Sequence, residues 1–322
     1  MLTRRTLAAG LLACPALVSG ARAQTWPTRP VKIIVPYPPG GSTDITARLV
    51  AEKLSQSLGQ RFVIDNRPGA GGNVGMEVAA SSPPDGYTLV VATTAHAINM
   101  TLFRQLNYDT RTSFEPIALL TENPLVLVVH PSLPAKTVAE LIADAKARPG
   151  ALNYASSGIG QSTHLAAELF CSMAGIRMTH VPYRGSAPGL ADVVAGHVQL
   201  MFDTTQSALP QIEDGRVRAL GITSAERLPI ASNIPTVAES GLPGYEAIAW
   251  NGFVVPKGTP PDIVSRLNAE VVRAVTDPEI KARFTKLGAT TRATTTDEFG
   301  RYLAAEIEKW GKVVRVSGAK VE

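Results

Sequence analysis

Residues 31–44 read VKIIVPYPPGGSTD and lead from a β-strand into a helix. Residues 31–35 form a short apolar run, which is typical of a buried strand. Apolar residues then recur at helical spacing until Gly59, a residue suited to ending a helix. A glycine pair and two hydroxyl residues lie between the two elements. This stretch therefore predicts the first strand-loop-helix unit of an α/β fold.

The rest of the chain repeats this alternation of short apolar strands and amphipathic helices. Such a pattern is typical of α/β proteins with mainly parallel sheets. We expect further strands at residues 62–64, 88–92, 125–129, 153–155, 180–181, 199–202 and 219–222. Two pairs have the spacing of a helix-capping box: Thr137 with Glu140, and Thr295 with Glu298. The prolines of residues 259–262 predict another helix start.

Two apolar segments, residues 124–131 and 247–256, are candidates for strands that cross between two lobes. If both cross, the first lobe comprises residues 24–124 plus 248–322, and residues 125–247 form the second lobe inserted between these parts. Small ligands bind in clefts between domains and beyond the carboxyl ends of parallel strands. The sequence therefore predicts a ligand cleft between the lobes.

The N-terminus has the features of a secretory signal peptide over residues 1–23. Arg4 and Arg5 precede the apolar run 7–18, and a small-x-small cleavage site ends at Ala23. We expect cleavage near Ala23 and Gln24 and a periplasmic location. Two alternatives are a lipoprotein box at Cys14 and a twin-arginine signal. The apolar run continues past Cys14, which favours the cleaved peptide.

Composition argues against several other classes of protein. Without the leader, 28 basic residues face 27 acidic ones, and no basic run remains to suggest a nucleic-acid surface. Cys171 is then the single cysteine, so no intramolecular disulfide can form. Its apolar neighbours predict a buried, unreactive thiol.

The loop after the first strand is one candidate ligand site. Gly40 and Gly41 lack a Cβ atom, so the backbone can approach a ligand closely. Ser42 and Thr43 add hydroxyl groups at a helix N-terminus, where unpaired N–H groups favour an anion. The alternative is a glycine-rich turn in which Ser42 or Thr43 caps the helix.

A second loop, NYASSGIGQSTH at residues 153–164, has the same arrangement after another strand. If each lobe supplies one such loop, the two can hold a carboxylate from opposite sides through N–H and hydroxyl groups. Two unrelated capped turns are the alternative.

A third glycine cluster at residues 66–75 is similar to a dinucleotide-binding fingerprint, but Val74 stands where glycine or alanine is required. We expect a tight turn near the cleft, with Asn73 as a polar contact. No serine elbow, zinc motif or phosphate loop occurs in the sequence. His164 and Glu168 lie one helical turn apart without a third ligand, so we expect no metal site and an exposed glutamate. Nothing in the sequence calls for a cofactor.

Six segments also match a known family in its own order: WPTRPVKIIVP (26–36), PGGSTDITAR (39–48), NRPGAGGNVG (66–75), DGYTL (85–89), HVPYRG (180–185) and WNG (250–252). In them the chain resembles the Bug family, the TctC-like extracytoplasmic receptors of tripartite tricarboxylate transporters. The resemblance spans nearly the whole mature chain. It implies a periplasmic binding protein type II-like α/β fold, with two lobes of mainly parallel sheet joined by two crossing strands.

The resemblance further implies that one carboxylate is held between residues 38–44 and residues 156–164. Thr94 and Asp203 follow strands whose ends should face the cleft. Asp203 has two open interpretations, a partner for a ligand ammonium or a cap for the next helix. The ligand-binding residues that we predict are Tyr37, Pro38, Gly40, Gly41, Ser42, Thr43, Asp44, Asn73, Thr94, Ser156, Ser157, Gly158, Ser162, Thr163, His164 and Asp203.

The function implied is capture of a small carboxylate, such as an amino acid, a di- or tricarboxylate or an aromatic acid, by a monomeric receptor without enzymatic activity. The partners implied are the permease subunits of a tripartite tricarboxylate transporter. A receptor that signals to a sensor partner is one alternative, and an exported α/β enzyme acting on a carboxylate is another.

Overall fold

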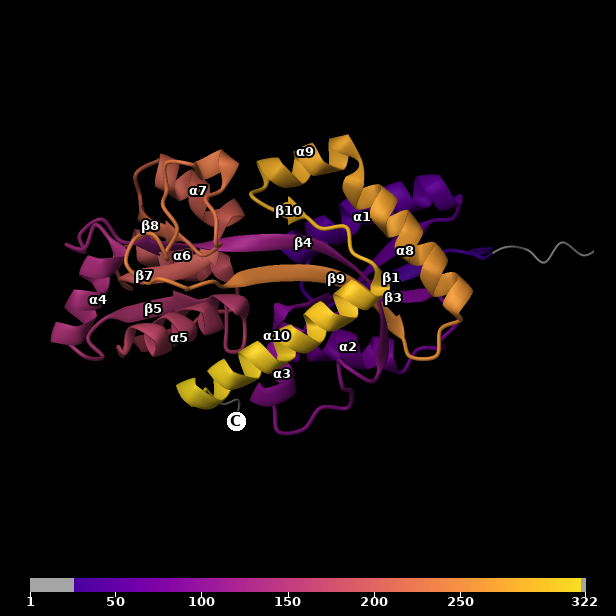
Figure 1. Ribbon diagram of the computed structural model, residues 1–322, viewed down its shortest axis with the longest axis horizontal. Helices are drawn as coiled ribbons and strands as arrows, with labels where there is room; N and C mark the ends of the chain where they lie inside the picture. Colours follow the sequence, from indigo (N-terminus) through magenta and orange to yellow (C-terminus); the bar gives the residue numbers. More distant parts are fainter. Residues whose placement is uncertain (1–25, 320–322) are drawn as a thin grey trace, which may run out of the picture.

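The computed structural model describes residues 26–319, in which ten strands form one sheet with helices on both faces (Figure 1). The strands are β1 (Val31–Val35), β2 (Phe62–Asn66), β3 (Thr88–Thr93), β4 (Phe114–Val129), β5 (Asn153–Ser156), β6 (Thr179–Pro182), β7 (Leu200–Thr204), β8 (Arg218–Ile222), β9 (Ile248–Pro256) and β10 (Thr290–Thr291). The predicted signal peptide 1–23, its cleavage near Ala23 and Gln24, and Cys14 lie outside these residues.

The α-helices are α1 (Ser42–Leu58), α2 (Asn73–Ala80), α3 (Thr94–Leu102), α4 (Val138–Ala147), α5 (Ser162–Ala174), α6 (Ser186–Val194), α7 (Thr205–Glu213), α8 (Pro261–Thr276), α9 (Pro278–Lys286) and α10 (Thr296–Ser317). Two short 3-10 helices are η1 (Ala70–Gly72) and η2 (Pro229–Ala231). Among the helices of residues 26–319, none has the length and apolar character that crossing a membrane requires.

The sheet order is β2-β1-β3-β9-β4-β7-β5-β6, with β8 and β10 also pairing with β4. The parallel pairs join β1 to β2 and β3, and β5 to β6 and β7. Every antiparallel pair in the described residues includes β4 or β9. Two groups of parallel strands therefore flank a long antiparallel pair, which supports our proposal of lobes at residues 24–124 plus 248–322 and at 125–247.

The strands predicted from apolar runs are present, but β4 is much longer than the predicted strand 125–129. Its middle includes Thr121, Glu122, Asn123 and Pro124, which interrupt the apolar pattern. Thr121 and Asn123 are buried, and the strand pairs with β9 from Phe114 to Pro124. These polar residues break the apolar run, so the sequence pattern did not predict this part of β4, which pairing with β9 stabilises.

The long helix α10 runs across the antiparallel pair, and it contacts α3, α5 and β4 (Figure 1). The Glu306 carboxylate accepts hydrogen bonds from the indole N–H groups of Trp250 in β9, at 2.9 Å, and Trp310, at 2.7 Å. One buried apolar cluster beneath this helix includes residues of both groups of parallel strands and their helices, such as Ile34 of β1 and Phe170 of α5. The helix therefore connects the two groups of parallel strands on one face of the sheet.

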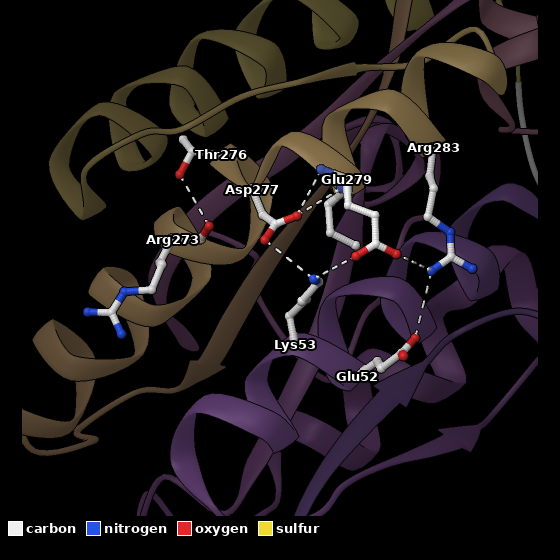
Figure 2. Close-up of polar contacts among 8 residues, drawn as sticks. Glu52, Lys53, Arg273, Thr276, Asp277, Glu279 and Arg283 are labelled. Carbon is white, nitrogen blue, oxygen red and sulfur yellow. Dashed lines mark hydrogen bonds and ion pairs between the residues drawn. The ribbon is translucent and has the colours of Figure 1, made fainter.

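On the other face, charged residues join α1 to the α8–α9 corner (Figure 2). The Lys53 ammonium lies 3.3 Å from the Asp277 carboxylate and 3.0 Å from that of Glu279. The Asp277 carboxylate also accepts from the backbone N–H groups of Glu279 and Ile280 at the start of α9. These contacts fix the C-terminal half of α1. The first glycine loop precedes the N-terminus of the same helix.

Candidate ligand-binding site

The first glycine loop leaves the N-terminus of α1 without a side-chain cap. Gly41 occupies the N-cap position, so neither Ser42 nor Thr43 caps the helix. Gly40 has a φ of +88°, a conformation that favours glycine. A Cβ atom on Gly41 would meet no other atom within 4 Å. Exposed backbone from Pro38 to Gly41 thus leads directly to a helix end with spare N–H donors.

Asp44 lies beneath this loop and holds it in place. Its side chain is 2% exposed. One carboxylate oxygen accepts from the Gly40 N–H at 2.9 Å and from the Arg48 guanidinium at 2.8 Å. The other accepts from the Asn66 amide at 2.9 Å. Because internal donors occupy both oxygens, we propose that Asp44 positions the loop instead of contacting the ligand as predicted.

The pKa of Asp44 reflects this arrangement. Burial by itself raises the pKa of the carboxyl, but hydrogen bonds from Arg48, Gly40 and Asn66 outweigh that effect and hold the pKa below its usual value. The carboxylate is therefore ionised at neutral pH, and its charge is balanced inside the protein.

The second glycine loop also ends at a helix without a side-chain cap, because Gln161 occupies the N-cap position of α5. The Thr163 hydroxyl accepts from the Ser157 N–H at 2.9 Å and shares a second hydrogen bond with the Ser157 hydroxyl at 2.8 Å. Ser157, Gly158 and Ser162 are partly exposed. They are the predicted contacts in this loop that remain accessible to a ligand.

Three predicted ligand contacts in this loop are buried instead: Ser156, Thr163 and His164 are at most 4% exposed. The prediction placed all three against the ligand because hydroxyl and small residues gather at this helix start and because the family resemblance implies that residues 156–164 hold the carboxylate. Their side chains bond to the loop itself, as Thr163 does through Ser157. We therefore assign them to the support of the loop.

The η1–α2 turn brings the two loops into one region. A Cβ atom on Gly72 would lie 3.1 Å from the Tyr37 hydroxyl, next to the first loop. A Cβ atom on Gly71 would lie 3.7 Å from the Gln161 amide nitrogen, in the second loop. The third glycine cluster, expected near the cleft, thus lies between the two candidate loops.

Tyr37 and Asn73 are fixed by internal hydrogen bonds in this region. The Tyr37 hydroxyl lies 3.0 Å from the Thr93 hydroxyl, and burial raises the pKa of Tyr37 to about 12 despite that hydrogen bond. The Asn73 amide oxygen accepts from Asn99 and from Tyr108, both at 2.7 Å. Asn73 is 2% exposed, and its amide oxygen joins α2 to α3.

Thr94 and Asp203 also have internal roles. The Thr94 hydroxyl accepts from the Trp250 backbone N–H at 2.9 Å, which ties α3 to β9. The Asp203 carboxylate accepts from the Thr204 N–H at 2.7 Å and from the Ser207 hydroxyl at 2.6 Å. Burial raises the pKa of this completely buried acid. Of its two interpretations, the contacts favour stabilising the start of α7.

Sequence reasoning missed the surroundings of His164. His164, His180 and Tyr154 form a stack, and the Tyr154 hydroxyl donates to Glu168. The Glu168 side chain is 19% exposed, so the expectation of an exposed glutamate was wrong. Tyr154 and His180 are register partners on the parallel strands β5 and β6, and strand alignment is the signal that would have paired them.

Two further sequence predictions concern metal-ligating side chains and the thiol of Cys171. In residues 26–319, no three His, Cys, Asp or Glu side chains come together as a metal site. Cys171 is buried, as predicted, and burial raises the pKa of its thiol to about 12. A thiol with that pKa is a poor nucleophile at neutral pH.

Comparison with known proteins links this arrangement to a receptor family. The profile of the Tripartite tricarboxylate transporter family receptor matches residues 46–319. Rpa4515 of R. palustris, solved with adipate, is 41% identical with a TM-score of 0.84, over 91% of this chain and 98% of that chain. MatC (Rpa3494) from Rhodopseudomonas palustris, with bound malate, is 35% identical with a TM-score of 0.81, over 90% and 100%.

The periplasmic binding protein BugD is 31% identical to this chain, with a TM-score of 0.81 over 92% of this chain and 100% of that one. These likenesses confirm the predicted α/β fold class of two-lobed periplasmic binding proteins. The matched family is one of receptors, and BugD is a periplasmic binding protein. The family match covers most of the chain, and the chain therefore belongs to the Bug and TctC receptors of tripartite tricarboxylate transporters.

Proposed function

We propose that this protein is a periplasmic receptor that captures a small carboxylate between its two lobes and delivers it to a tripartite tricarboxylate-type permease. The observation that carries the proposal is the pair of glycine loops, each ending at a helix N-terminus without a side-chain cap, α1 and α5. Such helix ends bind anions through backbone N–H groups. The adipate and malate in Rpa4515 and MatC support a carboxylate as the anion.

The ligand contacts that we propose are those left accessible by the internal hydrogen bonds. They are Pro38, Gly40, Gly41, Ser42 and Thr43 in the first loop and Ser157, Gly158 and Ser162 in the second. The exposed Arg184 lies beside the second loop, because the Gly185 N–H donates to the Ser157 carbonyl at 3.1 Å. Its positive charge favours an anionic ligand in this region.

The mechanism that we propose is a population shift between open and closed receptor. A ligand that bonds to both loops makes all of its contacts only when the lobes are closed, so binding stabilises the closed state. The closed state is then the form that the permease recognises. Release to the permease requires only that the lobes reopen, and no covalent step takes place.

Isothermal titration calorimetry of the mature, monomeric protein tests this function, with malate and adipate as probes and their uncharged diamides as controls. We expect saturable binding of at least one dicarboxylate and none of its diamide. At one hundred times the Kd, the ligand should raise the free energy of unfolding by about 2.7 kcal/mol. Failure of both acids, in protein refolded to remove carried-over ligand, would reject this assignment of ligand.

Two further measurements separate the alternatives. NMR of the bound probe over many hours detects any conversion, and a chemical change in the probe would favour an exported enzyme. Uptake of labelled dicarboxylate by cells with and without the receptor distinguishes delivery to a permease from signalling to a sensor partner. Loss of uptake on deletion is the expected result.

A further inference from the structure

Two imidazole rings lie face to face directly beneath the second glycine loop. The ring centres of His164 and His180 are 4.0 Å apart and their planes differ by 10°. The Tyr154 ring continues the stack, 4.9 Å from that of His180. His164 comes from α5, whereas His180 comes from β6, so the stack joins elements on both sides of the loop.

His164 holds the end of the loop. Its Nδ1 accepts the Gly160 backbone N–H at 3.2 Å, so this nitrogen carries no proton. The proton is then on Nε2, which lies 3.8 Å from the Glu168 carboxylate. Gly160 has a φ of +77°, and a Cβ atom there would lie 2.5 Å from the Leu102 side chain. The hydrogen bond from Gly160 to His164 therefore fixes the part of the loop that packs against α3.

His180 holds the beginning of the loop. Its Nε2 lies 2.6 Å from the Ser156 hydroxyl, which is completely buried. The same hydroxyl accepts the Gly158 N–H at 3.2 Å, and its proton has two acceptors, the Gly158 carbonyl at 3.3 Å and His180 Nε2. The position of Ser156 therefore connects the imidazole to the backbone at Gly158, one of the proposed ligand contacts.

We infer that the stacked pair His164 and His180 is a positioning device that sets the shape of residues 156–160 for ligand binding. This inference rests on the proposed function, because it concerns the same ligand loop. Neither imidazole touches the ligand in this assignment. Each ring fixes one end of the loop, and the stacking fixes the two rings relative to each other, so the backbone between them is preorganised.

Paired substitutions separate this role from simple packing. His164→Phe and His180→Phe keep a flat ring in the stack but remove the nitrogen that bonds to the loop. His164→Asn and His180→Gln lose the ring but place an amide near the position of that nitrogen. His130→Phe is the control, since His130 is another histidine of the second lobe whose ring packs against Gly196, outside the loop.

We expect malate or adipate to bind the two phenylalanine variants about tenfold more weakly, because each has lost one hydrogen bond that orders the loop. The asparagine and glutamine variants should recover most of that loss, and His130→Phe should match the wild type. A packing role predicts the opposite order, with the phenylalanine variants binding normally. That order would overturn the inference.

Hydrogen exchange measured by mass spectrometry provides a readout that needs no ligand. Amide exchange over residues 156–160 should become faster in the phenylalanine variants while the core strands stay protected. Unchanged exchange in this segment would contradict the positioning role even if no probe binds. Faster exchange together with no binding by the wild type would retain the positioning role and reject only the proposed ligand.

Discussion

At the scale of the residue, the two glycines of the first loop serve different purposes. Gly40 has a backbone conformation that side-chain-bearing residues rarely adopt, with φ of +88°. Gly41 has an ordinary φ of −79° and open space where a Cβ atom would be. The backbone thus requires glycine at position 40, whereas at position 41 the missing side chain keeps the helix N-terminus open.

This difference makes Gly41→Leu a clean test of the binding site. The leucine should leave the melting temperature within about 2 °C of the wild type, because it creates no clash and no strain. It should weaken binding of malate or adipate by at least about tenfold by covering the N–H groups of α1. Calorimetry and thermal unfolding measure the two effects.

Gln56→Leu is the matched control, an exposed leucine near the other end of α1. It should bind ligand as the wild type does. Normal affinity in Gly41→Leu would show that the ligand does not approach this helix end. Ser157→Leu is less informative, because it also breaks the hydrogen bond between Ser157 and Thr163.

Two acidic residues that were predicted as ligand contacts, Asp44 and Asp203, have hydrogen-bond partners inside the protein. Asp44 lies in the first turn of α1 and Asp203 lies near the end of β7, and their carboxylates accept hydrogen bonds from neighbouring loops and helices. A free carboxylate there would repel an anionic ligand. Internal donors satisfy these charges, and in the proposed site the N–H groups at the starts of α1 and α5 bind the ligand.

At the scale of the element, one of the two predicted capping boxes is complete and the other is half formed. The Thr137 hydroxyl accepts from the Glu140 N–H at 3.1 Å, and Glu140 accepts from the Lys136 N–H at 2.7 Å. At the start of α10, Thr295 and Glu298 form the complete reciprocal box. Local sequence determines these helix starts because the bonding groups are only three residues apart.

Removing the cap of α10 should cost stability. Thr295→Ala should lower the free energy of unfolding by about 1 kcal/mol, since the Glu298 N–H loses its acceptor. Thr295→Ser keeps a hydroxyl and should lie close to the wild type. Urea unfolding measures the stability of both variants. Equal stability for alanine and serine would show that the hydroxyl cap of α10 does not contribute to the free energy of unfolding.

At the scale of the whole molecule, buried neutral histidines should make stability depend on pH. Burial lowers the pKa of His96 and His164 to about 3 and that of His180 to about 4. Below pH 6.5 the unfolded chain binds protons that the folded protein excludes. The stability that these neutral rings contribute is complete above pH 6.5 and decreases as the pH falls from there toward 3.

His164→Asn isolates one of these groups. Between pH 5.5 and 4, the wild type should lose up to about 1.4 kcal/mol more stability per pH unit than the variant. The reason is that the wild type takes up one more proton on unfolding, at His164. Urea unfolding across this range gives both slopes. Parallel slopes would show that His164 does not remain neutral in the folded protein.

The sequence by itself determined the α/β class, the order of strands and helices, and the two glycine loops, because these depend on spacings of a few residues. Only the tertiary structure decided which side chains of those loops remain accessible. Asp44, Asn73, Thr94, Ser156, Thr163, His164 and Asp203 are all buried, and several bond to distant partners, such as Thr94 to Trp250, 156 positions away. Exposure and pairing of this kind depend on contacts between segments far apart in the chain, which no local pattern encodes.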